Sequence, residues 1–481
     1  MVGVNAQITQ EDEFLVGNPQ ITYFKAVYRR HSHFAIQQVE TSPQGTINAN
    51  GESEVVYKID DGGGHLLSRC WLEVELLPTP VGNSEAEYLN WTNNTGHAFL
   101  EYCKLKIGGQ IIDEHSGLYL DVYNELNDKD ESEHLGLNKH VCKNTYLRSN
   151  RHTLKPINLI IPFKFWFNKN PGLALPLISL DNSNVEFVMK FRNVNNLINI
   201  SNNYQLNGFI QAPVVKFFNE IIYLSAAEAK RFKQNRHEYL IETVQEEKNN
   251  LFSTNVITNF SHPVKELIWV IRHNDRFSGT TPGPNSRVDA TINRSYNSNS
   301  KVFQPPNPMI GNLTNTNNNN NLTHTDELRT QGNDYFEYCC GALGERDAGG
   351  VNVLTRTNVN QRHGGTNMYG FNDNGCDWFD KFQLDFSGAK CGVHINASYL
   401  RTSNPVKYGH KLPNKHVYSY SFSLSPDEYT PSGHYNFSNS SSQKLNFTFP
   451  ITNSNIVITI FAINYNIFRI MSGKAALIFT Q

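Results

Sequence analysis

The stretch "GNPQITYFKAVYRRHSHFAIQQVE" (residues 17–40) combines several aromatic residues with the basic run Tyr28-Arg29-Arg30-His31. It shows neither the 3.6-residue period of an amphipathic helix nor the strict alternation of a half-buried strand. Two interpretations of the basic run are therefore open. It is either a site that binds a charged ligand or part of a structural contact, and the rest of the chain must distinguish them.

Composition narrows the class of protein. The chain has 481 residues, so we expect two domains or one large domain with insertions. Its 42 Lys and Arg residues nearly balance 44 Asp and Glu residues, which gives no chain-wide attraction to nucleic acid or anionic lipid. Charged residues make up only 18% of the chain, whereas Asn, Ser, Thr and aromatic residues are abundant. This composition favours strands and polar loops, so we expect a β-rich protein with no direct nucleic-acid partner.

The N-terminal sequence and the cysteine pattern indicate a protein that folds in a reducing compartment. The start "MVGVNAQITQEDEF" lacks the basic and apolar regions of a signal peptide, and no apolar stretch is long enough for a membrane span. We therefore expect neither classical secretion nor a spanning helix. The 7 cysteines are odd in number and lack C-x-x-C spacing, which argues against a disulfide framework or a zinc ribbon.

Strand signals recur along the chain. In "SRCWLEVELLP" (68–78), Leu72, Val74 and Leu76 alternate with other residues, as in a half-buried strand. The pair Gly108-Gly109 separates two β-prone runs and predicts a hairpin, because a primed turn needs positive φ at both turn residues.

Helical signals are few and short. Residues 117–128 space their apolar side chains at helical intervals. Residues 225–240 begin with Ser225 and carry Glu228 three positions later, which predicts a helix start with a capping box. One helix in each half, each amid strands, indicates a duplicated β domain with a junction near 212–220.

Long loops and the C-terminus complete the pattern. Residues 274–333 are rich in Pro and contain "NTNNNNN" (315–321), and residues 341–376 are rich in Gly and Asn, so both predict long projecting loops. The end of the chain has successive apolar residues from Ala475 to Phe479, which predicts a last strand inside a sheet with both faces covered. We expect removal of residues 474–481 to make the protein insoluble.

Catalytic and metal-binding signatures are missing from the sequence. No P-loop, H-E-x-x-H or G-x-S-x-G motif is present, so we expect no enzyme activity, cofactor or metal site. His31-x-His33 without a third ligand favours ordinary hydrogen bonding over metal binding. "HEYLIETVQEE" (237–247) is interpreted as a helix end that passes into a strand with a solvated charged face, rather than as an acid–base site. Cys339-Cys340 is interpreted as two thiols rather than a redox pair.

Residues 17–40 resemble the N-terminal signature of the major capsid proteins of nucleocytoplasmic large DNA viruses, the group of iridoviruses, phycodnaviruses and mimiviruses. Five further blocks are similar to that family and follow in family order: "IPFKFWFNKNPGLALPLISL" (161–180), "AEAKRFKQNRHEYLIETVQ" (227–245), "SHPVKELIWVIR" (261–272), "YSYSFSLSPDEYTPSGHYNFS" (418–438) and "NYNIFRIMSGKAALIFTQ" (464–481). Together they span nearly the whole chain. "NFSNSS" departs from the family by lacking an Arg, and residues 339–376 match no family block.

The resemblance implies an all-β chain of two consecutive eight-stranded antiparallel jelly rolls with a few short helices and long outward loops. It implies an N-terminal segment (1–24) at the base, a first roll (25–212) and a second roll (213–481) that carries the loops 274–333 and 341–376. Three copies would form a pseudo-hexagonal capsomer that tiles an icosahedral shell over an internal membrane, after folding and assembly in the host cytoplasm.

The resemblance also implies partners: neighbouring capsomers, minor capsid proteins and penton proteins, close to the viral membrane. Tyr28, Arg29, Arg30 and His31 would then form base contacts with minor capsid proteins or membrane, since a guanidinium fork suits carboxylate and carbonyl partners. Direct binding of anionic lipid or DNA is the alternative. Asn312 and Asn321 are the most accessible candidate glycosylation sites. The competing function is a jelly-roll carbohydrate-binding or host-attachment protein, because fold alone does not fix function.

Overall fold

The computed structural model describes residues 16–26, 28–59, 64–77, 89–92, 94–127, 141, 156–200, 211–250, 255–273, 291–292, 313–315, 322–325, 335–336, 338, 377–413, 415–448 and 456–479. The strands of the first half are β1 (Phe34–Thr41), β2 (Pro43–Gln44), β3 (Ser53–Ile59), β4 (Leu66–Leu76), β5 (Leu89–Trp91), β6 (Leu100–Ile107), β7 (Gln110–Ser116), β8 (Ile157–Pro162), β9 (Val185–Phe191), β10 (Ile198–Ile200) and β11 (Val214–Leu224).

The strands of the second half are β12 (His237–Asn250), β13 (Asn255–Thr258), β14 (Pro263–His273), β15 (Thr291–Ile292), β16 (Leu313–Asn315), β17 (Leu322–Thr325), β18 (Lys381–Phe386), β19 (Ala389–Asn396), β20 (Val417–Ser421), β21 (Tyr435–Asn436), β22 (Gln443–Thr448), β23 (Ile456–Met471) and β24 (Lys474–Leu477). The α-helices are short: α2 (Thr95–Phe99), α3 (Gly117–Asn127), α5 (Trp166–Lys169), α6 (Ala226–Gln234), α9 (Ala397–Arg401) and α10 (Ser403–Lys407).

The two halves have the same strand order. In the first half, one sheet runs β1-β11-β4-β8 and the facing sheet runs β3-β9-β6-β7, with β2 beside β3. In the second half, the corresponding sheets run β12-β23-β14-β20 and β13-β22-β18-β19. Counting the eight principal strands of each half, one sheet joins the first, eighth, third and sixth strands and the other joins the second, seventh, fourth and fifth. This is the jelly-roll arrangement, so the predicted pair of eight-stranded rolls is confirmed.

The duplication extends to the connections. Helix α3 lies between the fifth and sixth strands of the first roll, and α9 with α10 lies between the fifth and sixth strands of the second roll. The loops predicted at 274–333 and 341–376 both fall between β14 and β18, the third and fourth strands of the second roll. Apart from β15, β16 and β17, these loops lie outside the described residues.

Local predictions from the sequence hold at several places. Along β4, Leu72, Val74 and Leu76 are buried on one face, as their alternation predicts. The turn between β6 and β7 has φ of 60° at Gly108 and 83° at Gly109, which is the positive-φ geometry expected of this hairpin.

The second predicted helix begins as expected but is not capped as expected. Ser225 is the N-cap of α6, yet its side chain makes no capping hydrogen bond. The backbone carbonyl of Ser225 instead accepts the amide of Ala229 in the first helical turn. The capping-box prediction is therefore wrong, although the boundary that it marked is correct.

The boundary between the two rolls along the chain lies at α6 rather than near residue 212. The division expected from the sequence places β11 in the second roll, whereas in the structure β11 lies between β1 and β4 of the first roll. The chain crosses to the second roll through α6, and β12 then pairs with β23.

The C-terminal strand differs most from its prediction. Among the described strands, β24 pairs with residues 468–471 of β23 and with no other strand. Its side chains are alternately exposed and half-buried, so it is a short edge strand. The strand covered on both faces is β23, which lies between β12 and β14. A run of mainly apolar residues does identify a strand that is covered on both faces, but this run is Ile456–Ile463 of β23 and not the run in β24. The expectation that loss of residues 474–481 opens the centre of a sheet is therefore wrong.

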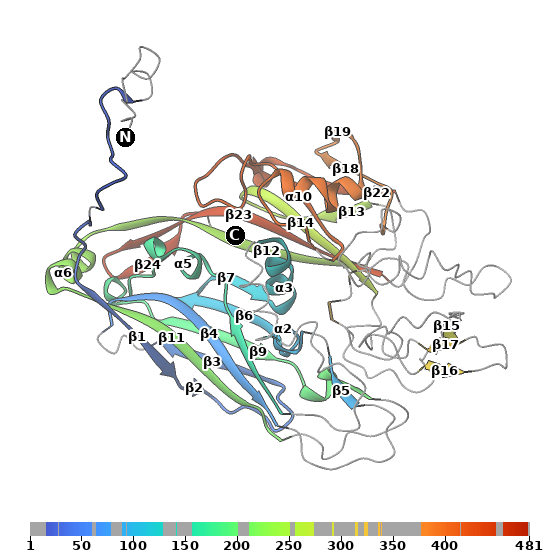
Figure 1. Cartoon of the computed structure of the whole chain (residues 1–481), viewed down its shortest axis with the longest axis horizontal. Coiled ribbons are helices and arrows are strands. Elements are labelled where there is room, and N and C mark those ends of the chain that lie inside the picture. Colours follow the sequence, from blue (N-terminus) through green and yellow to red (C-terminus); the bar gives the residue numbers. More distant parts are fainter. Residues whose placement is uncertain are drawn as a thin grey trace, which may run out of the picture.

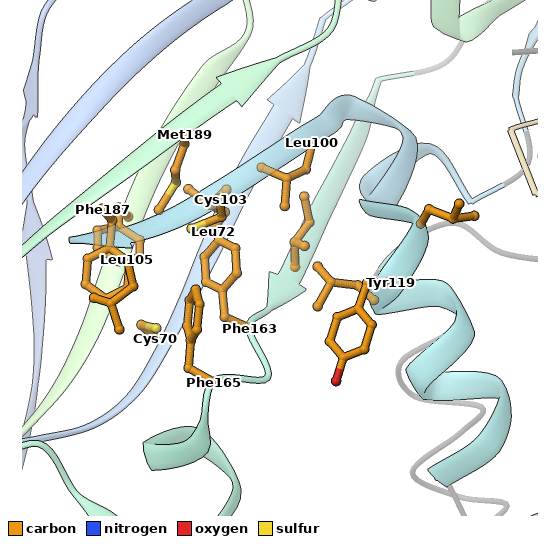
Figure 2. Packing of buried hydrophobic residues seen from close by; sticks show 14 of the residues in the cluster. Cys70, Leu72, Leu100, Cys103, Leu105, Tyr119, Phe163, Phe165, Phe187 and Met189 are labelled. Atoms are coloured by element: carbon orange, nitrogen blue, oxygen red, sulfur yellow. The ribbon is translucent and has the colours of Figure 1, made fainter. Parts of the chain in front are cut away.

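Among the described residues, two large hydrophobic cores stabilise the molecule, and a small third cluster contains Leu66, Ala174 and Ile222. The larger one fills the first roll and continues into residues of the second roll, including Ile268, Phe461 and Phe468. Figure 2 shows part of it, with Cys70 and Cys103 among Phe163, Phe165 and Phe187. Both cysteines are free and buried. The smaller core lies inside the second roll around Trp269.

Figure 1 shows the first roll in the lower part of the view and the second roll above it, with the long axis of the molecule horizontal. The segment before β1 leaves the body at the end that carries α6, and β15, β16 and β17 lie at the opposite end. Among the described helices, none is long and apolar enough to cross a membrane.

Candidate functional site

The predicted basic cluster lies on the N-terminal segment that projects from the body. Tyr28 is 83% exposed, and Arg29, Arg30 and His31 are exposed as well. The imidazole of His31 lies 2.7 Å from the carbonyl oxygen of Ser32 and packs edge-on against Phe34. Within the described residues, no carboxylate of the same chain forms an ion pair with Arg29 or Arg30. Both guanidinium groups are therefore accessible to a partner molecule.

The same segment also exposes apolar side chains. Ile21, Tyr23 and Phe24 are 68%, 87% and 100% exposed. Residues 15–39 contain Lys25, Arg29 and Arg30 but no Asp or Glu. An extended segment with large exposed aromatic rings and positive charge is typical of a surface that is covered in an assembly.

A second site, which the sequence patterns did not predict, is the seam, defined here as the contact between the two rolls. Glu242 of β12 forms ion pairs with Lys265 of β14 and, at 3.1 Å, with Lys169 of α5. The ammonium group of Lys265 also donates to the carbonyl oxygen of Pro426. Lys169 belongs to the first roll and Glu242 to the second, so this cluster joins the rolls through charge.

His410 makes the second polar link of the seam. Its Nε2 lies 2.9 Å from a carboxylate oxygen of Glu266, and its Nδ1 lies 2.7 Å from Oδ1 of Asn127. Both partner atoms accept hydrogen bonds, so a doubly protonated imidazolium satisfies both. The neighbouring amide of Lys411 donates to the carbonyl oxygen of Leu126 at the end of α3. These contacts hold the connection before β20 against the first roll.

The charges of the seam shift the pKa values of its groups. Burial alone would raise the pKa of Glu242, but Lys169 and Lys265 hold it below its ordinary value of 4.5. Burial alone would lower the pKa of His410, but Glu266 raises it above its ordinary value of 6.5. Both groups are therefore held in their charged forms.

A cavity of about 320 Å³ lies at the seam. Its walls combine the aromatic rings of Tyr119, Tyr123 and Trp166 with the charged groups described above. Lys169, Glu242, Lys265, Glu266 and His410 all have partners within the protein. These paired charges stabilise the contact between the rolls, and among the described residues no group of His, Cys, Asp or Glu could hold a metal ion.

A third polar cluster surrounds Asp121, a fully buried residue of α3. Its carboxylate accepts hydrogen bonds from Asn94 Nδ2 at 2.8 Å, from the Tyr338 hydroxyl at 2.6 Å and from Lys415 Nζ at 2.9 Å. Tyr338 belongs to the long connection between β14 and β18, and Lys415 precedes β20. Asp121 therefore ties two segments of the second roll to the first.

Sequence signals for the seam existed but were not decisive. Lys265 and Glu266 lie next to the apolar run Leu267–Ile271 of the strand "PVKELIWVIRH" (263–273), and Asp121 lies among the apolar residues of α3. Charges within apolar elements indicate buried pairs. Periodicity within one element does not reveal which distant residue supplies the partner.

The segment 237–247 corrects one prediction. His237 lies 2.6 Å from the carbonyl oxygen of Phe232 near the end of α6, and Glu238 pairs with Arg469, so the helix end does pass into a strand. The face is not solvated throughout, however, because Glu242 lies in the seam. Cys339 and Cys340, and the candidate glycosylation sites Asn312 and Asn321, lie outside the described residues.

The charged seam predicts a specific pH dependence. The raised pKa of His410 contributes stability that is complete below its ordinary value of 6.5 and is lost as pH rises through the folded-state value. His410→Gln keeps hydrogen-bonding capacity but removes the charge. We expect its melting temperature to fall furthest below that of the unaltered chain under mildly acidic conditions, with the difference shrinking at alkaline pH.

The measurement is thermal unfolding across a pH series, with His394→Gln at an exposed position of β19 as the control. The charged contact between His410 and Glu266 would be contradicted if the difference in melting temperature between His410→Gln and the unaltered chain stayed constant with pH.

Comparison with known proteins agrees with the resemblance of the sequence blocks. Residues 22–225 match the family model "Major capsid protein N-terminus", and residues 228–476 match "Large eukaryotic DNA virus major capsid protein". The second model alone covers more than half of the chain. The chain belongs to the major capsid proteins of large eukaryotic DNA viruses. It is therefore a structural protein of the virion, with its place in the capsid shell.

Individual relatives of this capsid protein match between about half and nearly all of its length. It is 27% identical to the major capsid protein of Phaeocystis pouchetii virus, with 98% of each chain aligned. It is 34% identical to capsid protein 1 of Acanthamoeba polyphaga mimivirus over 54% of this chain and 47% of that one. The fold is similar to that in the PBCV-1 virus capsid, with a TM-score of 0.66, 23% identity, and 96% and 100% of the two chains covered.

Proposed function

We propose that three copies of this capsid protein form a capsomer with a pseudo-hexagonal outline, and that such capsomers tile an icosahedral shell over an internal membrane. The observation that carries the proposal is the identical strand order of the two rolls. Because each chain supplies two rolls of one topology, three chains in a ring present six similar units. The continuous core between the rolls keeps each pair together as one building block.

The N-terminal segment is proposed to form the base of the capsomer. Tyr28, Arg29, Arg30 and His31 would contact minor capsid proteins or penton proteins, close to the membrane. Their exposure, and the projection of the segment from the end that carries α6, support this role. Arg29 and Arg30 can each form paired hydrogen bonds with a carboxylate on such a partner.

The opposite end is proposed to face outward. The strands β15, β16 and β17 lie there and pair only with one another among the described strands. The long connection between β14 and β18 would provide the outer loops, with Asn312 and Asn321 as the positions for any attached sugar. The chain is proposed to fold and assemble in the host cytoplasm without catalysing a reaction.

Sedimentation and native mass spectrometry of the purified chain test the trimer. We expect a single species of three times the chain mass of 54.7 kDa at micromolar concentration. Permanent interfaces of this kind bury more than about 2,000 Å² in total, so the trimer should persist on dilution. A chain that is folded but stably monomeric at micromolar concentration would refute this part of the proposal.

A further inference from the structure

The cavity at the seam, named the seam cavity below, is enclosed by both rolls. Its volume of about 320 Å³ lies within the range of about 300–1,000 Å³ that is usual for sites that bind small molecules. Apolar and aromatic side chains line it, namely Tyr119, Trp166 and Leu173 of the first roll with Ile268 and Ile463 of the second. A molecule in the seam cavity therefore contacts both rolls at once.

Two hydrogen-bond donors in the wall of the seam cavity have no acceptor in the part of the chain that the structure describes. They are the hydroxyl of Tyr119 and the indole N–H of Trp166, and both side chains are only 2% exposed. Burial raises the pKa of Tyr119, so its hydroxyl keeps its proton and remains a donor at neutral pH. Figure 2 shows this hydroxyl directed away from the labelled apolar side chains. Because buried Tyr and Trp donors usually have a partner, the site suits a ligand that supplies acceptors.

The charges around the seam cavity are already balanced. Its wall contains three cations and three carboxylates, namely Lys169, Lys265 and His410 with Glu242, Glu266 and Asp427. A ligand with a net charge would leave one charge without compensation in a buried site. The position over the ring of Tyr123, which attracts cations, is occupied by Nζ of Lys169 at 4.8 Å from the ring centroid. The seam cavity therefore selects an uncharged ligand.

The volume of the seam cavity sets the size of the ligand. A cavity of about 150 Å³ holds benzene, so a volume of about 320 Å³ has room for two fused rings. Aromatic side chains supply flat walls for such rings, since the rings of Tyr119 and Tyr123 lie 6.0 Å apart and Trp166 lies in the same lining. A planar molecule fits these walls better than a branched one.

The segment 422–434, between β20 and β21, forms the outer wall of the seam cavity. It contributes Pro426, Asp427 and Tyr429 to the lining. Tyr429 is 42% exposed, whereas Tyr119 and Trp166 are buried. The seam cavity therefore opens to solvent beside Tyr429, which gives a ligand a route of entry.

We propose that the seam cavity binds an uncharged, planar molecule of two fused rings that carries hydrogen-bond acceptors. The acceptors of the ligand receive the hydroxyl of Tyr119 and the indole N–H of Trp166. Because the bound molecule contacts both rolls, it binds the folded chain preferentially and stabilises the contact between the rolls. The inference does not depend on the proposed trimer, since every residue of the site belongs to one chain.

Coumarin is the probe for this site. It is uncharged, has two fused rings, and presents its carbonyl and ring oxygens as acceptors without any donor. We expect one molecule to bind per chain with a Kd of about 100 µM, a usual strength for a ligand of this size. At about ten times that concentration, the melting temperature should rise by roughly 2–4 °C. Coumarin-3-carboxylate, which adds a negative charge to the same rings, should bind at least about tenfold more weakly. Calorimetric titration and thermal unfolding measure these effects.

Two substitutions, each with a matched control, locate the binding. Tyr119→Phe removes one donor but keeps the ring, so we expect coumarin affinity to fall by up to about tenfold. Tyr399→Phe, at a residue of α9 that is 38% exposed and lies outside the lining, should leave the affinity unchanged. Leu173→Trp fills part of the seam cavity and should abolish binding. Leu424→Trp, at a residue that is 77% exposed and also lies outside the lining, should not.

The outcomes decide for or against the site. Weaker binding to Tyr119→Phe and none to Leu173→Trp, with both controls unchanged, supports it. The proposal would be overturned by the absence of saturable coumarin binding up to about 5 mM, or by binding that neither Tyr119→Phe nor Leu173→Trp weakens. Should Leu173→Trp misfold, a structure of the unaltered chain at saturating coumarin decides. Density for coumarin beside Tyr119 and Trp166 supports the site, and ordered water alone in the seam cavity contradicts it.

Discussion

Replacing Trp269 by Ala is expected to destabilise the protein by about 3–5 kcal/mol, the range for removing a buried Trp from a core. Trp269 is fully buried and is the largest side chain at the centre of the second roll. Its ring lies 4.8 Å from Phe382 and 6.0 Å from Tyr418, in stacked orientations, and also packs on Phe447. Its removal leaves a cavity bounded by rings from both sheets of the roll, and this cavity can close only if those rings and the strands that carry them move from their packed positions.

The measurement is thermal or denaturant unfolding of the purified variant. For a folded domain of the size of the second roll, this loss of stability lowers the melting temperature by roughly 10 °C. Tyr23→Ala is the control, because Tyr23 is an aromatic residue with 87% exposure on the N-terminal segment. Its removal is expected to change stability by no more than about 0.5 kcal/mol. Equal stability of Trp269→Ala and the unaltered chain would refute the placement of Trp269 at the centre of this core.

Asp121→Ala is expected to destabilise the protein by a similar amount, but for a different physical reason. The substitution leaves the Lys415 ammonium group, the Tyr338 hydroxyl and the Asn94 amide without the carboxylate that accepts from all three. Loss of one partner from a buried ion pair costs about 3–5 kcal/mol, because the remaining charge stays buried without compensation. The substitution weakens the contact between the rolls. We therefore expect the melting transition to shift to a lower temperature and to broaden or split.

The control for Asp121→Ala is an exposed ion pair. Asp181 pairs with Lys233 at 3.1 Å, with side chains 54% and 53% exposed. Asp181→Ala is expected to cost no more than about 1 kcal/mol, since exposed pairs are screened by solvent. Calorimetry of both variants measures the two losses of stability. If both losses were small and similar, the Asp121 cluster would not hold the rolls together.

Local pattern predicted much of the fold. The alternation through Leu72 and Val74 identified β4, and the pair Gly108-Gly109 identified the β6–β7 hairpin. These features depend on period and turn chemistry, which are properties of a few neighbouring residues. The six sequence blocks predicted the family, which the family models confirm.

Features that depend on the contact between the rolls were not predicted. A run of apolar residues shows that a strand is covered on both faces, but not what covers it, so β24 was assigned the buried position that β23 occupies. Glu242 was assigned to a solvated face because nothing near it in sequence reveals that Lys169, more than seventy residues away, is its partner. The basic cluster from Tyr28 to His31 lies on an exposed segment, so contacts within a single chain do not identify the partner proposed for it.

The most direct test of the central claim is the symmetry of the assembled protein. Cryo-electron microscopy of the purified capsid protein should show a particle with threefold symmetry and six similar lobes in projection, two from each chain. The N-terminal segments should emerge at one end of the particle and the connection between β14 and β18 at the other. A particle with twofold symmetry, or isolated chains with two lobes at concentrations where the protein is folded, would contradict the account.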